Sequence, residues 1–195
     1  MFEQSSFSAI NIKIGSNEFI AILADHLDWG GPFLAIEDKI LLFENENLVM
    51  KFFSDKEECN FSKVKEFNEL QEKAEENIFS LHREEAEADF DETGALLRDF
   101  DLSNWNSSQF NTVITTLGFL VDCILTLNND NLIVYFHSGI YPETGESSLG
   151  DFIEAVTQCD SELLGDQEEM FNPKEPYDVY SLLIGQITLN SIVYK

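Results

Sequence analysis

Lysine and arginine are scarce in this sequence. Its 195 residues contain 11 Lys and Arg against 37 Asp and Glu, which gives a formal net charge of −26. Affinity for DNA or RNA comes mainly from cations that neutralise phosphates, so this composition argues against direct nucleic-acid binding. The same field repels anionic membranes and attracts basic surfaces. We therefore expect a basic protein partner, and neither nucleic acid nor a membrane.

The scarcity is greatest in the C-terminal half. Residues 1–53 carry 8 acids and 3 bases, residues 54–98 carry 14 and 6, and residues 99–195 carry 15 and 2. Between positions 151 and 178 nine acids accompany one lysine. Local ion pairs cannot neutralise so many carboxylates, which leaves them available to cations from elsewhere.

Paired cysteines and catalytic motifs are also missing. Cys59, Cys123 and Cys159 are widely separated and form no C-x-x-C, so neither a zinc ribbon nor a redox pair is indicated. The sequence lacks a Walker A motif, G-x-G-x-x-G and G-x-S-x-G. It begins without a signal-peptide pattern, and the apolar run 113–127 is too short to span a bilayer. We expect a cytoplasmic protein that is not an enzyme and that uses no cofactor.

Core-forming side chains are plentiful. Hydrophobic residues make up 44% of the chain, 17 of them phenylalanine, which supports one domain over residues 1–195 without disulfides. Alternation at 9–14 predicts a strand, and the spacing of apolar residues at 18–29 predicts a helix capped by Ser16 or Asn17. Three short β-rich runs separated by turn residues, at 33–37, 39–44 and 48–53, then predict an antiparallel meander. These elements make up an N-terminal portion over residues 1–53.

Residues 57–90 are predicted to form one long amphipathic helix. Its apolar side carries Phe61, Val64, Phe67, Leu70, Ala74, Ile78 and Leu81. The opposite side carries Glu58, Glu69, Glu72, Glu76 and Glu87. This anionic face is either solvated or a docking surface for a basic partner.

The C-terminal α/β portion, 105–195, is predicted to begin with a helix over 109–127 capped by Ser107 or Ser108. Its second half, 119–127, has an alternative as a strand paired with residues 132–137. The remaining pattern predicts a helix at 151–164, an acidic loop at 165–178 and one or two strands at 180–194. The predicted fold class is α+β, with an antiparallel β-sheet and amphipathic helices packed on one face.

The stretch DFDETGALLRDF resembles two kinds of site. Asp89, Asp91 and Thr93 would fill positions 1, 3 and 5 of a calcium loop, but position 12, which needs a glutamate, is Phe100. The D-x-D-x-T of a phosphatase should follow a buried strand, and here it follows a charged stretch. If a helix ends near Asp89, these acids crowd the negative end of the helix dipole. This placement destabilises the helix by about 0.3–1 kcal/mol for each exposed charge. A basic partner would relieve that repulsion.

The function we expect is that of an acidic protein-binding inhibitor of the immunity or antidote type. It would block the basic face of a nuclease toxin or another nucleic-acid-binding protein. The predicted contact residues are Glu58, Glu69, Glu72, Glu76, Glu87, Asp89, Asp91, Glu92, Asp166, Glu168 and Glu169.

Two alternatives stay open. One is an uncharacterised enzyme or a calcium-binding domain that uses Asp89, Asp91 and Thr93, or an enzyme that uses His137 with distant carboxylates. The other is a structural or adaptor domain whose acidity serves solubility.

Overall fold

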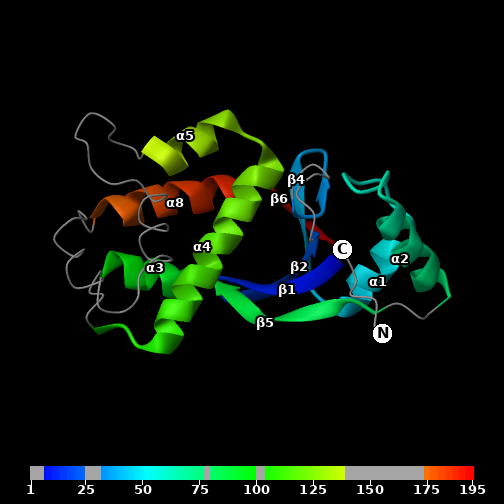
Figure 1. Ribbon diagram of the computed structural model, residues 1–195, viewed down its shortest axis with the longest axis horizontal. Coiled ribbons are helices and arrows are strands. Elements are labelled where there is room, and N and C mark those ends of the chain that lie inside the picture. The colour runs from blue at the N-terminus through cyan, green and yellow to red at the C-terminus, as the bar shows by residue number, and fades with distance from the viewer. Residues whose placement is uncertain (1–6, 25–31, 77–79, 100–103, 139–173) are drawn as a thin grey trace.

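A mixed six-stranded sheet organises the chain in the computed structural model, which describes residues 7–24, 32–76, 80–99, 104–138 and 174–195 (Figure 1). Its strands are β1 (Phe7–Ile14), β2 (Asn17–Ala24), β3 (Ala35–Ile36), β4 (Lys39–Phe43), β5 (His82–Asp89) and β6 (Ser191–Tyr194). Their order is β3-β4-β2-β1-β5, with β6 beside β4. The α+β class is confirmed. The sheet is mixed rather than antiparallel throughout, because β5 pairs in parallel with β1 and β6 in parallel with β4.

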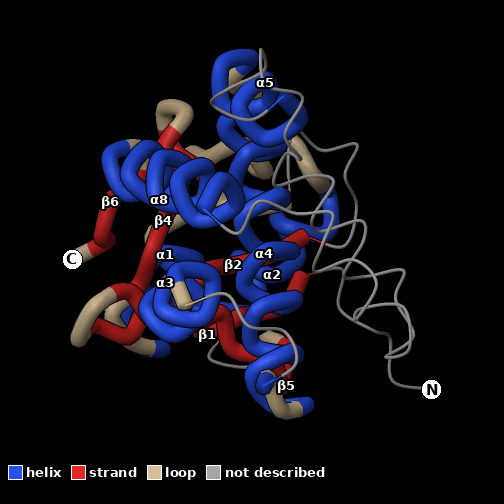
Figure 2. Tube along the Cα trace, turned by 90° about the vertical axis from the view of Figure 1, so that its left-hand side faces the viewer, coloured by secondary structure: helices blue, strands red, loops and turns tan. Residues whose placement is uncertain are grey.

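Helices cover both faces of this sheet, where the sequence predicted one covered face. Helices α3 (Phe90–Arg98), α4 (Ser107–Leu127), α5 (Asp130–Ser138) and α8 (Lys174–Leu189) share a core with Ile12 and Ala21. Helices α1 (Glu46–Ser54) and α2 (Lys65–Glu75) share a second core with Ile22 and Phe43. The two groups are displaced along the strands: the first lies at the left of Figure 1 and faces the viewer in Figure 2, and the second lies at the right of Figure 1.

Residues 17–24 form strand β2, so the helix predicted there is wrong. Ile20 and Ile22 belong to the core of α1 and α2, whereas Phe19 and Ala21 pack in the opposite core. A strand buried on both faces appears in the sequence as a continuous apolar run, without the alternation of a half-buried strand. The positive φ of Gly15, 62°, fits the tight turn that joins β1 to β2.

The β3–β4 hairpin confirms part of the predicted meander, but residues 48–53 lie in helix α1 instead of a third strand. The side chain of Asn45 accepts a hydrogen bond from the backbone N–H of Leu48 at 3.1 Å and so caps this helix. Val49, Phe52 and Phe53 are then buried on one side.

Among the described residues before Phe90, the long helix predicted over 57–90 is confirmed only at 65–75. Helix α2 ends at Glu75, and residues 82–89 form β5, an edge strand among those the structure describes. Phe67, Leu70 and Ala74 are buried as predicted. The β5 sequence, HREEAEAD, is unusual for a strand, and its dense charge discourages pairing with the edge of another sheet.

Helix α4 confirms the helix predicted over 109–127 and begins earlier, at Ser107, with Asn106 as its cap. The strand alternative for 119–127 is wrong, because these residues and their supposed partners at 132–137 are all helical. By length and composition alone, this 21-residue helix could cross a membrane. The expectation that it could not rested on the shorter apolar run 113–127. The helix also packs inside the protein, where Val113, Leu117 and Leu120 are buried.

The C-terminal residues form helix α8 followed by strand β6, so most of the strand predicted over 180–194 is wrong. Val179, Leu183 and Ile187 are buried at helical spacing. Residues 174–178, predicted as the end of an acidic loop, also belong to α8. The helix predicted at 151–164 and the loop before residue 174 lie outside the described residues.

Candidate functional site

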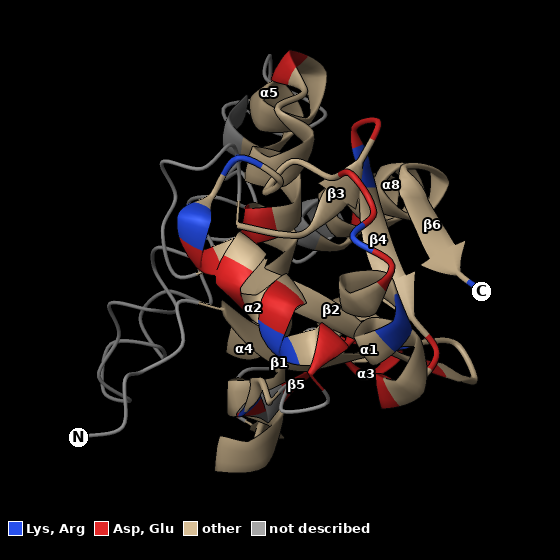
Figure 3. Cartoon of the chain, turned by 90° about the vertical axis from the view of Figure 1, so that its right-hand side faces the viewer, with Lys and Arg blue, Asp and Glu red and all other residues tan. Residues whose placement is uncertain are grey.

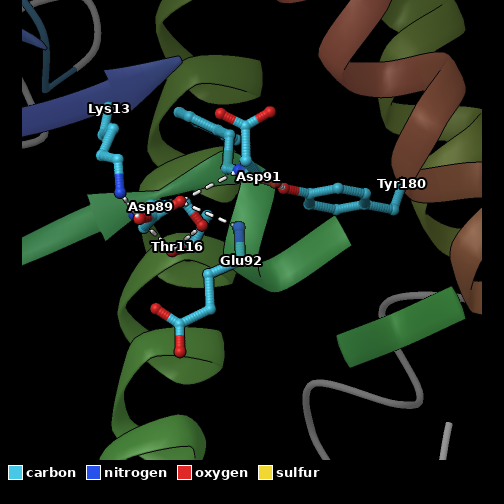
Figure 4. Close-up of polar contacts among 7 residues, drawn as sticks. Lys13, Asp89, Asp91, Glu92, Thr116 and Tyr180 are labelled. Carbon is cyan, nitrogen blue, oxygen red and sulfur yellow. Dashed lines mark hydrogen bonds and ion pairs between the residues drawn. The ribbon is translucent and has the colours of Figure 1, made fainter. Parts of the chain in front are cut away.

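Asp89 ends strand β5 and begins helix α3, so the acidic stretch forms the N-terminus of a helix (Figure 4). Its Oδ1 accepts hydrogen bonds from the backbone N–H groups of Asp91 at 3.1 Å and Glu92 at 2.9 Å. Its Oδ2 lies 2.6 Å from Nζ of Lys13 on β1. Anions stabilise the N-terminus of a helix. The prediction that these acids crowd an unfavourable helix end is therefore wrong.

The same residue joins several elements of the fold. The backbone N–H of Asp89 donates to Thr116 Oγ1 on α4 at 3.0 Å, and the hydroxyl of Tyr180 on α8 donates to the carbonyl of Phe90 at 2.7 Å. Burial raises the pKa of Asp89, but the backbone N–H of Glu92 and the ammonium of Lys13 more than offset that effect and lower this pKa from its ordinary value. Asp89 is thus an ionised junction between β1, β5, α3 and α4.

The calcium-loop alternative is wrong, because its three residues do not converge on one point. The Asp89 carboxylate already accepts two backbone N–H groups and contacts Lys13. Asp91 is exposed in the first turn of α3, whereas Thr93 is buried in that helix. Across the described part of the chain, no group of three or more His, Cys, Asp or Glu side chains could hold a metal ion.

The two cysteines that the structure describes, Cys59 and Cys123, are free thiols. Burial raises the pKa of both, and for Cys123 the neighbouring Asp122 raises it further. Because the thiolate is the nucleophile, these environments oppose thiol chemistry. His137 lies in α5 rather than at a strand end.

The acidic face predicted on a 57–90 helix is divided among several elements. Glu69 and Glu72 lie in α2, Glu58 precedes that helix, Glu76 is its C-cap and Glu87 lies in β5. The part on α2 is partly neutralised. Glu58, Glu69, Glu72 and Glu76 are all exposed. Lys65 pairs with Glu69 at 2.9 Å and Lys73 lies in the last turn, so two lysines accompany four glutamates on this helix (Figure 3). Such exposed pairs contribute little to stability, but they weaken the negative field at this face. The other predicted contact residues, Asp166, Glu168 and Glu169, lie outside the described residues.

A second anionic surface is a groove of about 420 Å³ on the sheet face that carries α1 and α2. The displacement of the helices leaves the Ile14 end of β1 uncovered on this face (Figure 1). The charged lining comes from β2, β5 and the segment that enters α1, and it consists of Glu18, Glu44, Glu46, Glu87 and Arg83. Four carboxylates therefore face one guanidinium.

Three of those carboxylates, Glu18, Glu44 and Glu87, are exposed and form no ion pair with any other described residue. Glu46 pairs with Arg83 at 2.8 Å. Glu87 was a predicted contact residue. No sequence pattern groups it with Glu18 and Glu44, because only strand pairing places β2 and β5 on either side of β1.

Comparisons with known proteins bear on the fold. No family model matches the sequence, and no curated protein matches it. Among solved structures, the chain is similar to the SatS C-terminal domain in complex with bromine, with a TM-score of 0.68 and 13% sequence identity. The similarity covers 97% of this chain and 95% of that one. At this identity the similarity supports the α+β fold and carries no information on function.

Proposed function

We propose that this protein is an immunity-type or antidote inhibitor that binds the basic face of a nuclease toxin or another nucleic-acid-binding protein. The observation that carries the proposal is the exposed anionic groove, which lies on a well-packed domain with a net charge of −26. Folding accounts for Asp89, Asp91 and Glu92 at the start of α3. Glu18 and Glu44 form no ion pair with other described residues, and Glu87 only adds an attraction to Lys13 that ranks behind that of Asp89.

Charge of this kind suits the capture of a protein that binds nucleic acid. A nuclease holds phosphates with Lys and Arg, and an array of carboxylates on a folded surface presents the same charge to those side chains. Complementary fields raise association rates well above those of neutral surfaces and disfavour partners of the wrong sign. Occupation of the basic face would then prevent the nucleic acid from binding.

The proposal predicts stoichiometric inhibition that depends on salt. The protein should be co-purified with the basic nuclease-like products of genes adjacent to its own, and nuclease activity measured as it is added. We expect complete inhibition at an equimolar ratio. The association rate constant should fall about 10- to 1000-fold from low to high ionic strength, because salt screens the field that steers the partners together.

Two results would contradict this function. One is an association rate that does not change with salt, which would remove the electrostatic basis. The other is a bound basic partner that retains full activity on DNA and RNA, as expected if the acidity serves only solubility or an adaptor role.

A further inference from the structure

We infer that the groove receives an extended segment of the basic partner in which an arginine and an apolar residue alternate. The inference rests on the proposed function, since it states how that partner is held. It selects the open sheet face rather than α2 as the principal contact. The groove contains a guanidinium of the protein itself and adjoins an apolar hollow.

The groove already holds a guanidinium. Arg83 donates from Nη1 to Glu46 Oε1 at 2.8 Å and from Nη2 to Asn11 Oδ1 at 2.6 Å. The side chains of Arg83 and Glu46 are 50% and 75% exposed, so water reaches both. An exposed pair of this kind contributes roughly 0–1 kcal/mol, so another guanidinium can replace Arg83 at little cost. The geometry at Glu46 and Asn11 therefore suits arginine, whose planar group forms two directed hydrogen bonds.

An apolar hollow of about 220 Å³ adjoins the groove. It shares Ile20, Glu46 and Arg83 with the groove, and its apolar lining adds Ala9, Val49, Met50 and Leu81. The Arg83–Glu46 pair thus lies between an anionic compartment and an apolar one. A ligand that uses both compartments needs a cation and an apolar side chain close together.

An extended chain supplies that arrangement. Alternate side chains of a strand point to the same side and lie about 6–7 Å apart, so an Arg-x-Leu sequence places both groups toward one surface. The unpaired carboxylates of Glu18, Glu44 and Glu87 supply the complementary charge, whereas lysines interrupt the negative charge of α2. The observations therefore favour an Arg-x-apolar segment in the groove over a flat contact at α2.

The test measures binding of a labelled peptide of repeated Arg-Ser-Leu-Ser units to the full chain by fluorescence anisotropy. Replacing Glu18 and Glu87 together with glutamine should raise the Kd about tenfold, because two charge contacts are lost. The matched control, Glu69→Gln with Glu72→Gln, removes the same charge from α2 and should change the Kd less than about twofold. Met50→Ser should weaken binding several-fold through the apolar compartment.

Arg83→Ala gives a result that a structural role would not produce. Removing the Arg83 guanidinium, which competes with the peptide for Glu46 and Asn11, should strengthen peptide binding. The increase should exceed that from Lys65→Ala, which removes a paired cation from α2. Equal losses from the groove and α2 double variants would overturn the inference, and so would weaker binding by Arg83→Ala.

The wild-type protein provides a check that does not depend on the folding of any variant. A peptide with serine in place of leucine should bind several-fold more weakly than the Arg-Ser-Leu-Ser peptide, and equal affinity would overturn the inference. If the variant with Glu18→Gln and Glu87→Gln still inhibits the toxin, the groove is not the binding site, but the proposed function is retained. Peptide binding in the groove with no inhibition of any basic partner would refute the function instead.

Discussion

Asp89→Ala is expected to lower the free energy of unfolding by about 2–4 kcal/mol at neutral pH. The change removes the acceptor for the backbone N–H groups of Asp91 and Glu92 and the carboxylate that pairs with Lys13. Denaturant unfolding followed by circular dichroism measures the loss. The matched variant Asp89→Asn keeps a good capping acceptor and loses the charge, so its loss should be roughly half as large.

The pH dependence of the same experiment identifies the ionised carboxylate as the cause. The hydrogen bonds and the Lys13 ammonium hold the pKa of Asp89 below its ordinary value in the folded protein. Its contribution is therefore fully present above the unfolded pKa, about 3.9, and is lost as the pH falls through the lower folded value. The difference in stability between wild type and Asp89→Asn should shrink on acidification. A difference that stays constant down to that pH would contradict the role given to the charge.

Phe67→Ala is expected to cost about 3–5 kcal/mol and to lower the melting temperature by roughly 10 °C. The Phe67 ring is fully buried, and its centroid lies 5.6 Å from that of Phe7, 5.0 Å from Phe53 and 6.0 Å from Phe61. These rings join α2 to α1 and β1. Their loss leaves a cavity between the helices and the sheet.

The control for this core is Glu72→Ala on the exposed side of the same helix, which should change stability by less than about 0.5 kcal/mol. Differential scanning calorimetry compares the two variants. Similar melting temperatures for Phe67→Ala and Glu72→Ala would show that α2 does not pack on this face of the sheet.

Elements whose apolar residues follow a clear period could be predicted from the sequence, and α4 and residues 9–14 of β1 are examples. Strand β2 could not, because Phe19 and Ile20 are buried in opposite cores and the polar alternation of a strand is absent. Gly15 was a local indication of the turn between β1 and β2. The helical spacing of the apolar residues after it favoured a helix instead. Strand β5 had no such signal, since five of its eight residues are charged and its place in the sheet comes from parallel pairing with β1.

The candidate site depended even more on tertiary structure. Asp89 and Glu92 carry the D-x-x-E spacing of a helix start, but the acidic residues before them favoured a continuous helix. Arg83 and Asn11 are 72 positions apart in the sequence, and their hydrogen bond depends on a β1–β5 register that shifts between Ala9 and Asn11. A basic partner stays a prediction from composition, whereas the groove could be identified only in the folded chain.

The central claim is that the groove carboxylates serve a partner rather than the fold. The most direct test measures, for Glu18→Gln with Glu87→Gln, both the melting temperature and the association rate constant with the basic partner. We predict an unchanged or higher melting temperature, because like charges are removed, together with slower association. A lower melting temperature with unchanged association would contradict the claim.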